Sequence, residues 1–218
     1  MFERPLTRKA WLGGAVVTAL GLAGLEARET DAASVSCILT PELTEGPYYI
    51  AGEKLRRNIT DGRPGAAMLL RTFVVDATTC RPIKNAAVDI WHADAGGVYS
   101  GFGAGASSRT FMRGIQRTNA HGLAQFRTVY PGWYQGRAVH IHVKVHVGGN
   151  VVHTGQLFFS DSLTDAVYRR APYSSRPNRT TRNAGDMIYR DGGSRSLLKV
   201  KRNSAGVYVA TITMGVRR

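Results

Sequence analysis

Apolar and polar residues alternate strictly over residues 138–147, and this is the clearest pattern in the chain. Apolar side chains occupy one face of an extended strand with this sequence: Val139, Ile141, Val143, Val145 and Val147. The opposite face carries Ala138, His140, His142, Lys144 and His146. Because the side chains of a strand point alternately to its two sides, we expect the valine-rich face to lie in a core.

Strand patterns recur along the rest of the chain, whereas helical periodicity is hard to find after residue 34. Further strands are expected at 68–76, 86–92, 111–118, 123–129, 151–159 and 207–214. These patterns, with turn sequences between them, predict an all-β protein, a β-sandwich of about seven to eight strands with long loops. One or two helical turns are expected at 162–168, and a long loop at 171–196.

The first 33 residues have the layout of an export signal. Arg4, Arg8 and Lys9 precede an uncharged stretch at 10–25, which is short for a membrane span. Residues 7–12 resemble a twin-arginine export motif with Lys in the second basic place. We therefore expect a signal peptide at 1–33, one domain at 34–218, and export to the periplasm or the extracellular space. An uncleaved membrane anchor is the alternative.

The chain contains two cysteines, Cys37 and Cys80. Export would place them in an oxidising compartment, where we expect a disulfide between them. In the chain-entropy account of disulfides, closing a loop of this length stabilises the fold by about 4 kcal/mol. Two buried free thiols are the alternative.

The net charge of +14 raises the question of a polyanionic partner, since 29 Lys and Arg face 15 Asp and Glu in 218 residues. The stretch 169–202 is strongly basic and loop-rich, but its basic residues are spread through Gly, Ser and Asn and aromatic residues are sparse. This composition favours a solvated basic surface over sequence-specific nucleic-acid binding. Attraction to an acidic polymer or surface remains an expectation.

Candidate metal ligands lie on the histidine face of the strand at 138–147. His140 and His142 are two residues apart, so their imidazoles point to the same side, within reach of one metal ion. Structural histidines are the alternative. Tyr134 precedes them in a turn, and Tyr99 stands in a Gly-rich loop that follows another expected strand.

Several ordered motifs together resemble the intradiol ring-cleavage dioxygenases, in particular the protocatechuate 3,4-dioxygenase-like branch and its small exported members. The residues that carry the resemblance lie between about 37 and 160: Leu39-Thr40-Pro41-Glu42, Glu45-Gly46-Pro47-Tyr48-Tyr49, Trp91-His92-Ala93-Asp94, Gly97-Val98-Tyr99, Pro131-Gly132-Trp133-Tyr134 and Arg137-Ala138-Val139-His140-Ile141-His142. The resemblance implies a non-haem Fe(III) enzyme. Such enzymes cleave the ring of catechol-type aromatics with O2 and form cis,cis-muconate-type diacids.

The resemblance also implies roles for individual residues. The iron ligands would be Tyr99, Tyr134, His140 and His142. Tyr134 would leave the metal when substrate binds, Arg137 would stabilise charge developing on the ring, and Gln156 would lie in the same pocket. Tyr48 and Trp91 would form walls of the substrate site.

The chemistry of these donors agrees with that assignment, because a trivalent cation favours anionic oxygen ligands and lowers the pKa of a coordinated tyrosine. Two alternative functions fit parts of the pattern. One is a zinc hydrolase in which His92, His121, His146 or His153 adds a third ligand. The other is a secreted, non-catalytic β-sandwich that binds carbohydrate or an acidic polymer through its basic surface.

Overall fold

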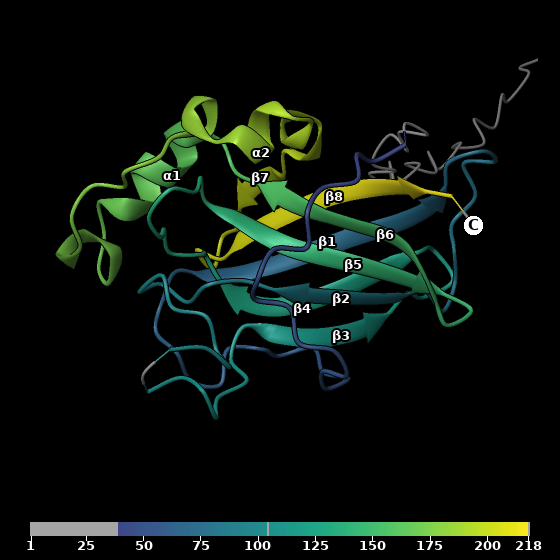
Figure 1. The fold of residues 1–218 in the computed structure, drawn as a ribbon, viewed down its shortest axis with the longest axis horizontal. Helices are drawn as coiled ribbons and strands as arrows, with labels where there is room; N and C mark the ends of the chain where they lie inside the picture. The colour runs from purple at the N-terminus through teal and green to yellow at the C-terminus, as the bar shows by residue number, and fades with distance from the viewer. Residues whose placement is uncertain (1–38, 104, 218) are drawn as a thin grey trace, which may run out of the picture. The chain divides into compact units, whose positions relative to one another are not determined.

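The computed structural model describes residues 39–103 and 105–217. The predicted signal peptide and Cys37 lie outside these residues, so the export signal and the pairing of Cys37 with Cys80 stay predictions. Within the described residues, eight strands form two sheets of four strands each, which confirms the predicted all-β sandwich (Figure 1). No helix in these two ranges has both the length and the apolar character that a membrane crossing requires.

The first sheet has the strand order β4-β1-β8-β7. Its strands are β1 (Ala67–Asp76), β4 (Leu123–Val129), β7 (Lys199–Arg202) and β8 (Tyr208–Val216). The two central strands, β1 and β8, run parallel, and the outer strands pair with them antiparallel. Alternate residues of β1 are buried, so this sheet presents one apolar face to the interior.

The second sheet has the order β3-β2-β5-β6 and is antiparallel throughout. Its strands are β2 (Ala87–Trp91), β3 (Arg113–Arg117), β5 (His140–Val147) and β6 (Asn150–Phe158). The predicted turn at 148–150 joins β5 directly to β6. The β5–β6 pairing has a register shift between Val145 and His146, which leaves Val152 of β6 without a partner on β5. Val147 still packs against the core, as the alternation predicts.

The core lies between the two sheets. Val139, Ile141, Val143 and Val145 are all buried in it, as the alternation predicts, and they pack with residues of the first sheet such as Leu70. His140 and His142 point to the other face of β5 and are also buried. A second layer of structure must therefore cover that face.

The segment that precedes β1 provides part of this cover. It crosses the outer face of the second sheet from β6 to β3, as the purple trace in Figure 1 shows. The Leu43 amide donates to the Thr154 carbonyl at one side, Glu45 forms an ion pair with Lys144 in the middle, and the Arg56 amide donates to the Ile115 carbonyl at the other side. We call residues 43–56 the crossing strap. It lies against His142, since a Cβ atom at Gly46 would be 3.1 Å from His142 Cε1.

The stretch predicted to be a long loop at 171–196 is instead a series of short helical turns. Helix α1 (Asp161–Tyr168) confirms the expected helical turns, and it is followed by 3-10 turns at Tyr173–Ser175, Asn183–Gly185 and Gly193–Ser196 and by α2 (Met187–Arg190). These elements gather beside one edge of the sandwich, near β6 and β7 (Figure 1). Turns of three or four residues are too short to produce a helical periodicity in the sequence.

Candidate metal centre

Strand β5 places the two histidines so that their ring nitrogens face each other. The Nε2 atoms of His140 and His142 are 3.0 Å apart. The Nδ1 atom of His140 lies 2.7 Å from the Ala138 carbonyl oxygen, which can only accept a hydrogen bond. Nδ1 therefore carries the proton in the neutral ring, and Nε2 keeps the lone pair that a metal ligand needs.

Two tyrosines complete the cluster from separate loops. The hydroxyl oxygen of Tyr134 lies 3.2 Å from His140 Nε2, and the hydroxyl oxygen of Tyr99 lies 3.5 Å from the same nitrogen. Tyr99 comes from the loop after β2 and is 5% exposed, whereas Tyr134 comes from the turn between β4 and β5 and is half-buried. Tyr99 thus converges on one point with Tyr134, His140 and His142, which are close to one another in the sequence.

The loops that carry the two tyrosines are held together by tight backbone packing. Asp94 folds the first loop by accepting hydrogen bonds from the amides of Gly96 and Val98 at 2.9 and 3.0 Å. The Gly132 amide of the second loop donates to the Asp94 carbonyl. A Cβ atom at Gly132 would lie 2.5 Å from that carbonyl oxygen, so only glycine permits this approach.

Burial controls the protonation of the four groups. Desolvation lowers the pKa of His140 to about 3 and lowers that of His142 well below its usual value, so both imidazoles are neutral at neutral pH. Desolvation also raises the pKa of Tyr99 well above its usual value and raises that of Tyr134, although the nearby Arg137 charge opposes the rise at Tyr134. A multivalent cation at this point would favour both phenolates.

The donor set fits a ferric ion better than a zinc hydrolase site. Two phenol oxygens and two neutral imidazoles are the donors that the resemblance implies for Fe(III). Among the described residues, no group of three or more His, Cys, Asp or Glu side chains is arranged to hold a metal. Two of the proposed third zinc ligands are engaged elsewhere, since His92 hydrogen-bonds Thr128 and His153 pairs with Glu42.

Arg137 and Gln156 contact each other beside the cluster, and their roles in a substrate pocket stay predictions. The Arg137 Nη2 atom donates to Gln156 Oε1 at 2.5 Å, and Gln156 Nε2 donates to the Thr44 carbonyl at 2.8 Å. Gln156 is directly opposite His142 in the β5–β6 register and is completely buried. The amide of Gln156 therefore connects Arg137 to the crossing strap.

Tyr48 and Trp91 occupy different places around the cluster. The ring of Tyr48 stacks on Tyr99 with centroids 4.2 Å apart, meets Tyr134 edge-on, and is half-buried. The ring of Trp91 stacks on His142 with centroids 4.9 Å apart and is 1% exposed. Tyr48 thus borders the tyrosine pair, whereas Trp91 supports the imidazole of His142 from within the protein.

Sequence reasoning missed two charged residues that organise this region. Arg113 is buried and donates to the carbonyls of Ser100 and Tyr48, both at 2.7 Å. Ser100 follows Tyr99 in the chain and Tyr48 stacks on it, so Arg113 holds both neighbours of Tyr99 in place. Asp186 accepts a hydrogen bond from Arg137 Nε at 2.9 Å. No spacing or motif distinguishes either residue, because each acts through contacts between distant segments.

Comparisons with known proteins agree with this geometry. A family model described as Dioxygenase matches residues 44–168. An intradiol ring-cleavage dioxygenase from Tetranychus urticae is 35% identical, with a TM-score of 0.80 over 83% of this chain and 95% of that chain. The dioxygenase domain of a dioxygenase carbohydrate-binding protein fusion from Streptomyces sp. SirexAA-E is 29% identical, with a TM-score of 0.64 over 83% and 99% of the two chains.

Catechol 1,2-dioxygenase 1 of Acinetobacter lwoffii is 36% identical over 100 residues, which are 44% of this chain and 32% of that protein. The match thus spans about a third of the length of this curated relative. The family model covers more than half of the chain, and the Tetranychus structure is matched over almost its whole length. The chain belongs to the intradiol ring-cleavage dioxygenase family.

Proposed function

We propose that this protein is a non-haem Fe(III) intradiol dioxygenase that cleaves the ring of catechol-type aromatics with O2 and forms cis,cis-muconate-type diacids. The observation that carries the proposal is the convergence of Tyr99, Tyr134, His140 and His142 on one point. The names of the relatives support the substrate class, since those of the curated proteins include catechol and chlorocatechol 1,2-dioxygenases.

The four converging side chains would hold the iron, which when bound supplies Lewis acidity toward the two oxygens of the diol. Tyr99 is nearly inaccessible and is wedged between Tyr48 and the histidines, so it is suited to remain in place throughout. Tyr134 is half-buried, and its hydroxyl oxygen is the better placed to accept a proton from an incoming diol.

Arg137 supplies a fixed positive charge next to this reaction site. Its guanidinium is close enough to Tyr134 to oppose the rise of that tyrosine's pKa. Negative charge that develops on the bound ring would be stabilised by this guanidinium without reorganisation, because Gln156 already holds it. The Tyr48 ring provides an apolar edge against which an aromatic substrate can pack.

The test is oxygen uptake by the purified, iron-loaded protein on a panel of catechols. We expect one O2 consumed per catechol without NADH, a muconate-type product, and a burgundy colour from phenolate-to-iron charge transfer. A semialdehyde product of extradiol cleavage would contradict the ligand assignment. A folded protein that is colourless and binds no iron would instead support the non-catalytic binding module.

We also propose that the protein is exported and that residues 1–33 are its signal peptide. The support is the order of basic, uncharged and small residues in this stretch. Cell fractionation and N-terminal sequencing of the mature protein test the proposal. Replacement of both Arg8 and Lys9 by Gln should leave the precursor in the cytoplasm, and a wild-type chain found there at full length would contradict export.

A further inference from the structure

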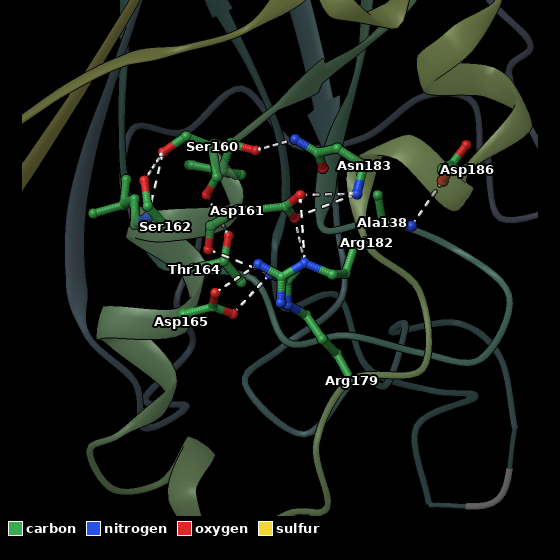
Figure 2. Close-up of polar contacts among 12 residues, drawn as sticks. Ala138, Ser160, Asp161, Ser162, Thr164, Asp165, Arg179, Arg182, Asn183 and Asp186 are labelled. Carbon is green, nitrogen blue, oxygen red and sulfur yellow. Dashed lines mark hydrogen bonds and ion pairs between the residues drawn. The ribbon is translucent and has the colours of Figure 1, made fainter.

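The arginine-rich stretch after residue 168 lies outside the region that the family model matches, yet it sends one side chain to the site. This side chain is Asp186, whose carboxylate is completely buried. Its Oδ2 atom accepts from Arg137 Nε at 2.9 Å and from the Ala138 amide at 2.7 Å. One oxygen therefore contacts both Arg137 and Ala138, which lies two positions before His140. Figure 2 shows the contact between Asp186 and Ala138.

The other oxygen of this carboxylate is engaged by the backbone that follows it. Asp186 Oδ1 accepts from the amides of Ile188 and Tyr189 at 2.8 and 3.1 Å, so Asp186 is the N-cap of α2. Burial alone would raise the pKa of Asp186, but the Ala138 amide and the Arg137 charge outweigh burial and hold it below its usual value. Asp186 is thus a fixed anion against the Arg137 guanidinium.

The segment that carries Asp186 is tied to α1 by ion pairs. Arg179 pairs with Asp161 at 2.5 Å and with Asp165 at 2.7 Å, and Arg182 pairs with Asp165 at 2.8 Å. Asn183 adds a hydrogen bond from its side-chain amide to the Phe159 carbonyl at 2.8 Å. Figure 2 shows these groups meeting beside the start of α1.

These contacts give two arginines of the basic stretch 169–202 a structural role. The Arg179 side chain is only 5% exposed, and its charge-assisted hydrogen bonds to Asp161 and Asp165 bind the segment to α1. The tie at Asn183 lies only three residues before Asp186 and restricts where its carboxylate can go. A continuous series of polar contacts therefore runs from α1 through this segment to Arg137 and Gln156.

We infer that Asp186 is a positioning residue of the dioxygenase site, which orients the Arg137 guanidinium toward the bound ring, and that the segment 179–186 acts as its support. The inference rests on the proposed function, because Arg137 is assigned there to stabilise charge on the substrate. Gln156 holds Nη2 and Asp186 holds Nε, so the two together fix the plane of the guanidinium.

The decisive experiment compares Asp186→Asn with Asp191→Asn in iron-loaded protein. Asp191 lies at the other end of α2, is exposed, and provides a matched control. We expect Asp186→Asn to lower kcat per bound iron about 10- to 100-fold with KM changed less than about 3-fold, because a loosened Arg137 mainly loses its effect on the transition state. Asp191→Asn should match the wild type in both constants.

A double-variant cycle separates positioning from a general structural role. If Asp186 acts through Arg137, the Arg137→Ala/Asp186→Asn double variant should have the kcat of Arg137→Ala alone. A further multiplicative loss in the double variant would overturn the inference. In the iron-loaded protein, phenylglyoxal should modify Arg137 several-fold faster in Asp186→Asn than in the wild type, as peptide mass spectrometry would show.

Asn183→Ala provides a second variant if Asp186→Asn does not fold, because it loosens the support and leaves the carboxylate intact. It should lower kcat in the same direction by a smaller factor. A wild type that consumes O2 with catechol while Asp186→Asn or Asn183→Ala retains full kcat overturns the positioning role alone. A wild type that consumes no O2 overturns the proposed function, and the positioning role with it.

Discussion

The difference in burial between the two tyrosines has a direct consequence at the residue scale. Tyr99 is 5% exposed and packed between Tyr48 and the histidines, whereas Tyr134 lies half-buried in a turn. Water from solvent can take the place of a hydroxyl lost near the surface, but it reaches a buried position less readily. The two hydroxyls therefore contribute unequally to iron binding, although they lie at similar distances from His140.

We predict that Tyr99→Phe loses most of its iron, whereas Tyr134→Phe retains iron and shifts the visible absorption band. The loss of iron affinity in Tyr99→Phe should be about 10-fold or more, and the loss of kcat in Tyr134→Phe about 10²-fold, because its proton acceptor is gone. Metal analysis and visible spectra check both. Equal iron loss in the two variants would contradict this difference.

Asp89 gives the stability of the protein a pH dependence that is separate from the metal centre. Burial is the largest cause that raises the pKa of Asp89 from 3.8 to about 7, and the nearby Glu53 charge adds to the rise. A hydrogen bond with Tyr49 and the Arg113 charge oppose it. Folded Asp89 thus keeps its proton where the unfolded residue has lost it. The free energy of unfolding should therefore fall as pH rises from about 4 to about 7 and should not fall further because of this group above that.

Replacing Asp89 by Asn should remove this contribution to the pH slope and stabilise the protein at pH 8. At about 1.4 kcal/mol per unit of pKa shift, the gain has an upper limit of about 4 kcal/mol. Urea unfolding of both proteins at pH 5 and pH 8 measures the difference. The same pH slope in the variant and the wild type would show that Asp89 is not its source.

The residues of the site differ in how far the sequence alone predicts them. Alternation places His140 and His142 on one face of a strand, and the structure brings their Nε2 atoms together. Tyr99 and Tyr134 could be selected only through the family resemblance, because nothing in their local pattern ties them to those histidines. Asp186 could not be selected at all, since its role depends on how a segment of short turns packs against β5.

At the scale of elements, β5 separates stability from metal binding on its two faces. Ile141 is completely buried in the core between the sheets, and its neighbour His142 faces the metal centre from the other side of the strand. Removing a buried isoleucine side chain leaves a cavity that the core fills only in part. The imidazole of His142 is a polar group whose burial costs free energy and lowers its pKa. Removing it should therefore change the stability of the iron-free protein less than removing Ile141.

We therefore predict that Ile141→Ala lowers the free energy of unfolding by about 2–5 kcal/mol and leaves iron bound per folded protein unchanged. His142→Ala should abolish iron binding and activity together and should change the free energy of unfolding of the iron-free protein by less than about 2 kcal/mol. Denaturant unfolding and metal analysis distinguish the two effects. Unfolding of His142→Ala at room temperature would assign His142 a structural role instead.

The elements that the sequence predicts well are those with an apolar, strand-like or helical pattern of their own. Strand β4 has the expected bounds, and β1, β2, β3, β5, β6, β8 and α1 end within about two residues of their expected positions. Strand β7 was not predicted, because Lys199–Arg202 is a short, mostly exposed edge strand inside a basic stretch. The register shift after Val145 was also missed, since a bulge leaves no mark on the order of apolar and polar residues.

At the scale of the whole molecule, the excess of positive over negative side chains is larger than the ion pairs of individual arginines can balance. The chain carries a net charge of +14, and some of its arginines, such as Arg179 and Arg182, are neutralised by α1. The unbalanced remainder produces a positive potential that reaches over roughly a Debye length, about 10 Å at 0.1 M salt. This potential attracts anions and leaves neutral molecules unaffected.

This charge predicts that salt affects anionic and neutral substrates differently. For a carboxylated catechol such as 3,4-dihydroxybenzoate, kcat/KM should fall about 3- to 10-fold when salt rises from about 0.01 M to about 0.5 M, because screening weakens the attraction. For catechol, which is uncharged at neutral pH, kcat/KM should change less than about 2-fold. Oxygen-uptake rates at several salt concentrations supply both values. An equal response of the two substrates would show that the net charge does not promote the approach of anionic substrates.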